Sequence, residues 1–309
     1  RLHEHTANVY VSLSKNYATG TSVSVSATGE YYTIGSYRKW AVYPQASLTY
    51  VKSPEHLFQF SLSTDKTYPG YWDMQSSVSH LNGYTELWGT PGLKPSTTYN
   101  LNGNYIWKQK YIFGLFFMHT SDFFVQTGYQ STDRLALIYK NTNWNYMQMW
   151  GANVILPFKV GNWLDSRLTL IGMQVRQRCD DFFDIPFNRK KWMFNGSLDN
   201  TFKVSKNLAL ELIGSLQTPM IQGTFGIETV YNLTAGIKWG FANDRISLSA
   251  RCSDLFNSGM PNLKVRFKGQ HLDMNNGFYS RAFTLLFNYR FGGYKKKEVR
   301  KIDTSRFGH

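Results

Sequence analysis

The sequence contains few cysteines and prolines, and it has no long apolar run. Its 309 residues include two cysteines, Cys179 and Cys252, which cannot form a disulfide framework and show no metal-ligand spacing. Nine prolines and 25 glycines exclude collagen and proline-rich disorder. No run of about 18 apolar residues is present, which excludes a transmembrane helix. The chain starts at Arg1 without a signal peptide, so any export signal is expected upstream of this residue.

Charged residues are also scarce, at 17% against roughly 25% in soluble domains. Aromatic residues make up a further 17%, which excludes an intrinsically disordered chain. The mean hydropathy is nevertheless negative, at −0.37. Strands with one face toward lipid and the other toward water explain this combination, because they need apolar residues only at every second position.

The net charge of +14 is spread along the whole chain. One dense basic run is present, at Lys295–Lys297, Arg300 and Lys301. Proteins that bind nucleic acid usually concentrate their basic residues on one face. We therefore predict no nucleic-acid partner.

Apolar and polar residues alternate with a period of two, most clearly in residues 245–253 and 281–291. A soluble β-sandwich alternates in a similar way with its apolar face inward, so alternation alone leaves both folds open. Segments of ten or more residues and aromatic residues near strand ends favour a membrane barrel. We expect Leu233, Ile246, Leu248, Phe283 and Leu285 to point outward. The expected interfacial girdles contain Tyr31, Tyr32, Trp40, Tyr43, Tyr50, Tyr105, Trp107, Tyr111, Trp163, Trp192, Trp239 and Tyr289.

The pattern predicts thirteen strands, joined by connections that alternate between short and long. The predicted strands are 6–14, 20–32, 40–51, 56–66, 98–108, 111–126, 144–157, 164–177, 190–203, 208–217, 227–239, 245–255 and 279–291. The long connections are 67–97, 127–143, 178–189 and 256–278. This alternation is typical of outer membrane barrels, which have tight periplasmic turns and long outer loops. Because such barrels usually have an even number of strands, we expect the C-terminal part of a larger barrel, or one strand missing from the prediction.

Four segments resemble TonB-dependent receptors. Gly-Thr-Pro-Gly-Leu-Lys-Pro at 89–95 resembles the motif that ends a long outer loop in these proteins, although Thr90 and Ser96 stand where Asn and Glu are usual. Ser-Asp-Leu-Phe-Asn at 253–257 and residues 280–292 resemble the end of the same barrels. The tail at 293–308 resembles the subfamily called outer membrane protein β-barrel, receptor-like.

This resemblance implies a barrel of about twenty-two strands that is closed by an N-terminal plug domain. The plug couples to TonB, and the energised complex imports a bound nutrient. The sequence departs from that pattern because it contains no recognisable plug or TonB-box segment. It would supply the later strands of the barrel only.

The connection 67–97 is the best candidate for ligand binding, because loops of this length are usually functional or disordered. Five aromatic residues in it offer flat faces for a sugar, a ring or an apolar ligand: Tyr68, Tyr71, Trp72, Tyr84 and Trp88. The alternative is that these rings pack the loop onto itself or over the plug.

No catalytic motif, metal site or cofactor is predicted. His3, Glu4 and His5 lack a third structural ligand. The acidic group Asp180, Asp181 and Asp184 follows Arg178 and does not match a calcium-loop spacing, so a solvated loop is expected.

We therefore predict an all-β fold, an antiparallel up-and-down transmembrane β-barrel to which this chain supplies the C-terminal strands. Residues 1–292 would form the barrel segment and residues 293–309 a basic tail. The predicted function is a receptor in the outer membrane of Gram-negative bacteria that imports a nutrient with TonB-supplied energy. The expected partners are outer membrane lipid, lipopolysaccharide, a plug domain, the TonB system and an unidentified nutrient. A surface-binding protein that does not transport, an outer membrane barrel enzyme and a secreted soluble sandwich remain as alternatives.

Overall fold

The computed structural model describes residues 3–242, 245–275 and 277–291, and the described residues form nineteen β-strands. The long strands are β1 (Glu4–Asn16), β2 (Ser22–Ile34), β3 (Tyr37–Ser53), β4 (His56–Thr67), β7 (Ser96–Trp107), β8 (Tyr111–Gln130), β9 (Leu137–Val160), β10 (Leu164–Phe182), β11 (Ile185–Lys203), β12 (Leu208–Gln217), β15 (Val230–Phe241), β16 (Ile246–Ser253) and β19 (Ala282–Tyr289). The short strands are β5 (Val78–Asn82), β6 (Thr85–Trp88), β13 (Met220–Gln222), β14 (Phe225–Ile227), β17 (Leu263–Phe267) and β18 (Gln270–Met274).

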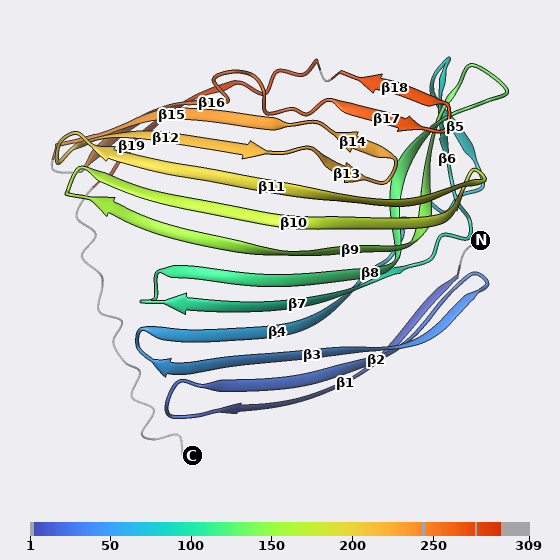
Figure 1. Ribbon diagram of the computed structural model, residues 1–309, viewed down its shortest axis with the longest axis horizontal. Helices are drawn as coiled ribbons and strands as arrows, with labels where there is room; N and C mark the ends of the chain where they lie inside the picture. Colours follow the sequence, from blue (N-terminus) through green and yellow to red (C-terminus); the bar gives the residue numbers. More distant parts are fainter. Residues whose placement is uncertain (1–2, 243–244, 276, 292–309) are drawn as a thin grey trace.

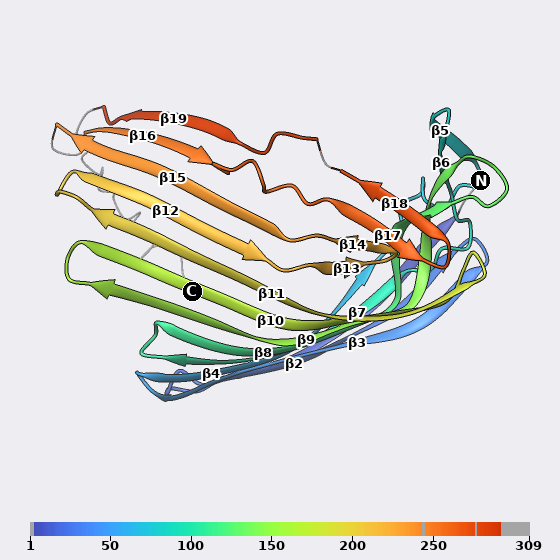
Figure 2. The ribbon, with the colours of Figure 1, turned by 45° about the horizontal axis from the view of Figure 1, so that its top comes forward.

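The thirteen long strands form one sheet, each paired with the next along the chain. All the pairs between them are antiparallel. Figures 1 and 2 show this sheet curved into an open trough that runs from β1 to β19. The prediction of thirteen strands in an all-β, up-and-down antiparallel wall is confirmed.

The two faces of this wall differ as the alternation predicts. On β2, Val23 and Val25 point to the convex face, and Ser24 and Ser26 point to the concave face. The five apolar side chains that were expected to face outward lie outside the buried core. The register of the sheet places Phe283 and Leu285 on the same face as Ala235 and Ile237, and both side chains are exposed, at 80% and 72%.

Aromatic pairs on the convex face mark two levels of the wall. Tyr31 contacts Trp40 with ring centroids 4.7 Å apart, and Trp150 contacts Trp192 at 4.9 Å. At the opposite ends of the strands, Trp107 contacts Tyr111 at 5.2 Å. Such pairs at two heights are the girdles expected where strands leave a lipid layer.

Two of the predicted girdle residues lie elsewhere. Tyr32 and Tyr43 are on the concave face, where both are buried and contact Glu30 or Lys66. The prediction was wrong because it used closeness to a strand end. It ignored whether a residue stands at an odd or an even position, which decides the face of the strand that it occupies. Tyr32 shares its face with Ser24 and Ser26, whereas Tyr31 lies on the other side of the sheet.

One end of the wall has short turns, and the other carries most of the additional structure. The predicted loops at 127–143 and 178–189 are wrong in large part, because β8, β9, β10 and β11 continue into them as long hairpins. The predicted loops at 67–97 and 256–278 each contain a two-stranded hairpin, β5–β6 and β17–β18. We call this elaborated end, on the right in Figure 1, the outer end.

Among the described residues, no helix is long and apolar enough to cross a membrane. The predicted boundary after residue 292 and the basic tail at 293–309 lie outside the described residues.

Candidate functional site

The hairpin of β8 and β9 leaves the wall and crosses the outer end. Pairing of β7 with β8 stops at Ser121, and pairing of β9 with β10 stops at Tyr146. Beyond these residues the two strands pair with each other from Phe123–Trp144 to Gln130–Leu137. Asp122 lies at the point of departure with φ of 50°, a left-handed conformation that bends the strand. Figures 1 and 2 show the hairpin running from the wall to β17 and β18.

One face of the crossing hairpin packs against β10 and β11. Trp144 is fully buried, and its ring centroid lies 5.4 Å from that of Phe187. Cys179 and Phe182 complete this cluster. Large buried side chains of this kind hold the hairpin in one position, because any shift opens a cavity.

The other face of the hairpin packs toward β2 and β3. Phe124 contacts a cluster of Tyr32, Ile34, Met74 and Leu93, all of which are buried. Met74 and Leu93 belong to the connection between β4 and β7, so the same cluster anchors that connection. The hairpin therefore links two parts of the wall that are distant in sequence.

The turn between β13 and β14 fits closely against the hairpin. A Cβ atom at Gly223 would lie 2.5 Å from Thr127 Cγ2, and its φ of +55° favours glycine. Gln177 accepts a hydrogen bond from the Gly223 backbone N–H at 2.8 Å. Arg189 Nη1 donates to the carbonyl oxygens of Gly223 and Thr224 at 3.1 and 3.0 Å. These contacts fix the turn between the hairpin and β10–β11.

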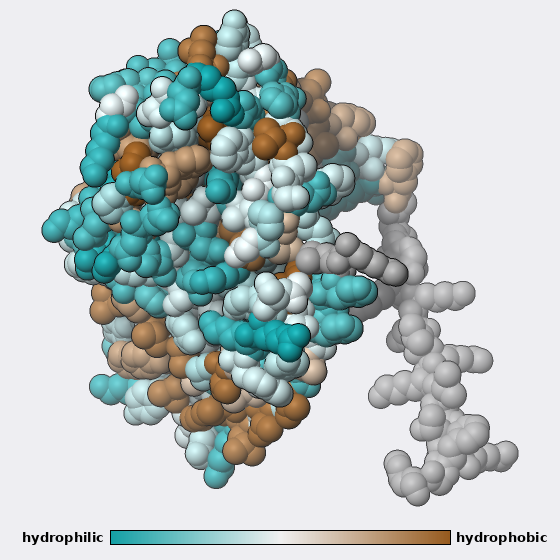
Figure 3. Space-filling model, turned by 90° about the vertical axis from the view of Figure 1, so that its right-hand side faces the viewer, coloured by the Kyte–Doolittle hydropathy of each residue, from teal (hydrophilic) through white to brown (hydrophobic). Residues whose placement is uncertain are grey.

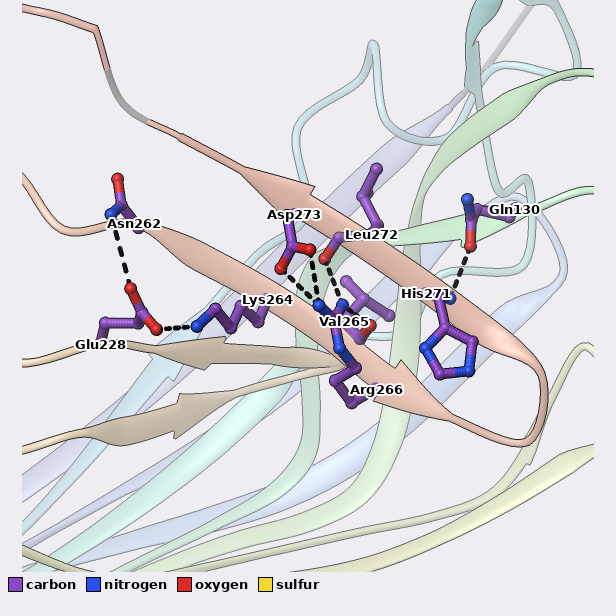
Figure 4. A network of polar contacts seen from close by, with 9 residues as sticks. All are labelled: Gln130, Glu228, Asn262, Lys264, Val265, Arg266, His271, Leu272 and Asp273. Atoms are coloured by element: carbon purple, nitrogen blue, oxygen red, sulfur yellow. Dashed lines mark hydrogen bonds and ion pairs between the residues drawn. The ribbon is translucent and has the colours of Figure 1, made fainter.

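The tip of the crossing hairpin is held by β18 (Figure 4). The Gln130 backbone N–H donates to Gln270 Oε1 at 2.5 Å, and Gln270 Nε2 donates back to the Gln130 carbonyl at 2.8 Å. The His271 backbone N–H donates to Gln130 Oε1 at 2.8 Å. Gln270 is buried, so its removal leaves these backbone groups without their partner.

The β17–β18 hairpin forms its own polar network in the same view. Arg266 Nη2 donates to both carboxylate oxygens of Asp273, at 2.5 and 2.6 Å, and Nη1 donates to the Leu272 carbonyl at 2.9 Å. These hydrogen bonds hold the pKa of Asp273 below its usual range. Lys264 forms an ion pair with Glu228, which lies between β14 and β15, and this pair lowers the pKa of Glu228. The charges of this network neutralise one another, so it stabilises the hairpin and presents no free charge of one sign.

A second polar cluster surrounds Lys66 at the outer ends of β2, β3 and β4. Lys66 and Glu30 form an ion pair, with both side chains under one tenth exposed. The Lys66 ammonium lies 4.3 Å from the ring centroid of Tyr32 and 4.8 Å from that of Tyr68. Tyr68 and Tyr43 donate to Glu30 at 2.6 and 3.1 Å. Every charge in the cluster has a partner, so its role is to fix Tyr68 and the start of the following connection.

The five predicted ligand-binding aromatics fall into two groups. Tyr68 contacts Glu30 of β2 and Tyr71 contacts Glu4 of β1, with Trp72 next in the chain, whereas Tyr84 and Trp88 lie on the β5–β6 hairpin. Tyr68 is packed as described, and Trp88 lies 6.0 Å from Phe183 and donates to Glu86 at 2.8 Å. Tyr71, Trp72 and Tyr84 keep most of their surface exposed, at 62%, 82% and 65%.

The β5–β6 hairpin is attached to the crossing hairpin. Strand β6 pairs with β9 in parallel, from Thr85–Leu137 to Trp88–Lys140. Arg134, in the turn between β8 and β9, donates to Glu86 with distances of 2.6 to 3.1 Å. The Arg134 guanidinium and Trp88 hold the pKa of Glu86 below its usual range. The pairing of Glu86 with Arg134 was not predicted from the sequence, because no local pattern joins residues 48 positions apart.

Figure 3 looks onto the outer end. Most of this face is hydrophilic, and hydrophobic residues gather toward the side of β1–β4. The described residues contain no group of three or more His, Cys, Asp or Glu side chains placed to hold a metal ion. Glu4 accepts a hydrogen bond from Tyr32 at 2.9 Å, and Asp180 pairs with Arg178 at 2.7 Å. The outer end thus offers exposed aromatic faces on an anchored framework.

Comparison with known proteins gives one family and several structures. A family model described as the outer membrane protein beta-barrel family matches residues 3–289. No curated protein sequence gives a significant match. The siderophore receptor PirA from Pseudomonas aeruginosa is similar with a TM-score of 0.59 at 12% identity, over 82% of this chain and 45% of that chain.

Two further solved structures have the same architecture. The FrpB iron transporter from Neisseria meningitidis has a TM-score of 0.59 at 12% identity, over 94% of this chain and 46% of that chain. The copper transporter OprC has a TM-score of 0.58 at 11% identity, over 82% and 42%. At these identities the likeness shows the fold, and the chain spans less than half the length of these three proteins.

Proposed function

Because the chain belongs to the outer membrane protein β-barrel family, we propose that it forms the wall and ligand-receiving surface of a nutrient receptor. The protein lies in the outer membrane of Gram-negative bacteria. In the proposed receptor, a plug domain closes the barrel, and the TonB system supplies the energy for import. The chain carries out no chemistry on the nutrient in this proposal. Its wall provides a passage lined by polar groups, and its outer end captures the ligand.

The observation that supports this function best is the exposure of Tyr71, Trp72 and Tyr84 on a fixed loop. Met74 and Leu93 anchor the connection between β4 and β7 in a buried cluster, and Glu86 holds the β5–β6 hairpin to Arg134. Rings that are exposed before a ligand arrives, on backbone that is already ordered, bind with a smaller entropy cost. Tyr71 and Trp72 in one group and Tyr84 in the other are therefore the proposed ligand contacts.

The ligand class is proposed from the similar structures. Their names describe receptors or transporters for siderophores, iron and copper. A metal chelate with flat organic groups also suits exposed aromatic faces. Ferric enterobactin, which a further similar structure is named for, and a copper(II) salt are the first probes.

The test is a titration of the purified full-length protein, followed by tryptophan fluorescence. We expect Trp72→Ala to weaken binding about 10-fold, the loss of about 1.4 kcal/mol of stacking. Trp40→Ala is the matched control, because Trp40 is 73% exposed but lies on the convex wall. The affinity of this variant for the probe should stay within about twofold of that of the unaltered protein. Binding that is unchanged in Trp72→Ala, or absent for both probes, would contradict the proposed surface.

Uptake distinguishes the alternatives. A receptor of the proposed kind accumulates the labelled probe in cells with TonB and only binds it in cells that lack TonB. Equal accumulation in both strains, or binding without accumulation in either, would favour a surface-binding protein. Conversion of the probe by the purified protein would favour an outer membrane enzyme.

A further inference from the structure

A group of basic side chains lies on the convex face at the outer ends of β10 and β11. We call Arg176, Arg178 and Lys190 the basic outer patch. All three side chains are exposed. In the register of the sheet, Arg176 is directly opposite Lys190. The patch therefore places two cations on neighbouring strands with their Cβ atoms only about 5 Å apart.

The charges of this patch are poorly compensated by the protein itself. Asp180 pairs with Arg178 at 2.7 Å. Within the described residues, neither Arg176 nor Lys190 forms an ion pair. Like charges directly opposite each other destabilise a sheet, so this arrangement needs an anion from outside the chain to be favourable.

The Arg176 side chain is nevertheless held in place. Its guanidinium carbon lies 5.7 Å from the Tyr146 ring centroid, and Nε donates to Asn188 Oδ1 at 3.5 Å. The remaining guanidinium donors are free to meet a ligand. A planar guanidinium beside an ammonium suits the tetrahedral oxygens of a phosphate group.

The height of the patch on the wall indicates where that phosphate comes from. Trp192 and Trp150 both pair with Gln174, two residues before Arg176. The patch is therefore about 7 Å beyond the outer aromatic girdle, at the level of lipid headgroups. Below the girdle, the same face carries Leu170 and Phe194, with exposed fractions of 46% and 57%. A ligand that joins a phosphate to acyl chains fits both surfaces at once.

We propose that the basic outer patch binds a phosphate group of the glycolipid of the outer leaflet, the lipid A part of lipopolysaccharide. The acyl chains of this lipid lie along Leu170 and Phe194, and the phosphate bridges Arg176 and Lys190. This inference rests on the location of the wall in the outer membrane and is independent of nutrient import. A free phosphate ion would contact only the charged side chains and not Leu170 or Phe194, so it should bind far more weakly than the lipid.

The experiment measures lipid binding to the purified full-length protein in detergent by native mass spectrometry. The probe is bis-phosphorylated lipid A, and the variant is Arg176→Gln with Lys190→Gln. We expect this variant to bind lipid A at least about 10-fold more weakly, because two charge-assisted contacts are lost. The matched control is Lys108→Gln with Lys110→Gln, which removes the same charge beside Trp107 and Tyr111 at the opposite girdle. Its affinity should stay within about twofold of the original.

Three results would overturn the proposal. The first is unchanged lipid A affinity in the patch variant, and the second is equal binding of dephosphorylated lipid A to the unaltered protein. The third is displacement of lipid A by inorganic phosphate at the same concentration, which would indicate a simple anion site. Without lipid, the patch variant should melt at the same temperature or higher, since a like-charge contact is relieved. None of these results depends on nutrient uptake.

Discussion

The wall and the outer end of this protein depend on different kinds of information. In the wall, a two-residue alternation decides which side chains meet lipid, and any apolar side chain of suitable size serves on the convex face. At the outer end, single contacts decide the arrangement, such as Gln130 with Gln270 and Glu86 with Arg134. The effect of a substitution in the wall should therefore depend on the polarity of the new side chain, whereas the effect of one at the outer end should depend on the partner that is lost.

The largest contrast should come from two tryptophans on the same strand. Trp144→Ala at the outer end removes a fully buried ring, and we expect it to cost about 3–5 kcal/mol of the stability of the crossing hairpin. Trp150→Ala on the convex wall should cost less than about 1 kcal/mol, because its ring is half exposed. Hydrogen exchange of residues 123–145 measures the first effect, and urea unfolding measures the second. Equal costs at the two positions would show that burial of the ring does not distinguish the outer end from the wall.

The stability of the wall should depend strongly on the charge of a lipid-facing side chain and weakly on its shape. Leu170→Arg places a cation on the lipid face between the girdles, and we expect a loss of about 2–4 kcal/mol in the free energy of unfolding from lipid vesicles. Leu170→Phe keeps an apolar surface and should change this free energy by less than about 0.5 kcal/mol. If both substitutions had the same effect, polarity would not be what specifies this face.

Loss of the contacts at the hairpin tip should destabilise the crossing hairpin less than loss of its buried tryptophan. Gln270→Ala leaves the Gln130 backbone groups without their partner, so we expect a cost of about 1–3 kcal/mol. Hydrogen exchange of the amides at the tip measures this cost. His271→Ala is the control, since His271 contributes its backbone N–H to Gln130. A large effect of His271→Ala and none of Gln270→Ala would show that another contact holds the tip.

The smallest effect should be a pH dependence of the β5–β6 hairpin. Hydrogen bonds from Arg134 and Trp88 lower the pKa of Glu86 in the folded protein from its ordinary value of 4.5. The contact is therefore fully present above that value and is lost as the pH falls through the lowered pKa. Limited proteolysis of the hairpin between pH 7 and pH 3 should show faster cleavage only at the acidic end.

Glu86→Gln provides the check on this interpretation. It should cleave faster at pH 7 and lose most of the pH dependence, whereas Glu55→Gln, in a turn at the other end of the wall, should behave like the original protein. A pH dependence that survives in Glu86→Gln would assign the effect to another group.

The difference between the wall and the outer end also decides how much of the fold could be predicted from the sequence. All thirteen strands of the wall were found, because each strand alternates locally and needs no knowledge of its neighbours. The sequence was also sufficient to place Tyr32 on the concave face, had the alternation of Val23 and Val25 been extended along β2. The pairing of β6 with β9 was not available, because it joins segments about fifty residues apart.

The candidate binding surface was predicted in part. The loop and its aromatic residues were found from length and composition, but their division into packed and exposed rings was not. Tyr68 and Trp88 are held by Glu30 and Glu86, whose positions depend on the assembled outer end. Local sequence contains no signal for such contacts, since both carboxylates could equally have faced water.

Alternate residues of the wall should face lipid and water, and spin-label accessibility along β10 measures this alternation residue by residue. Single labels at positions 164–174 are compared in lipid vesicles for collisions with oxygen, which favours lipid, and with a water-soluble nickel chelate. We expect oxygen accessibility to peak at Leu168 and Leu170 and to fall at Thr169 and Ile171. A profile without a two-residue period, or one with the odd positions facing lipid, would show that the faces of the wall are not arranged as described.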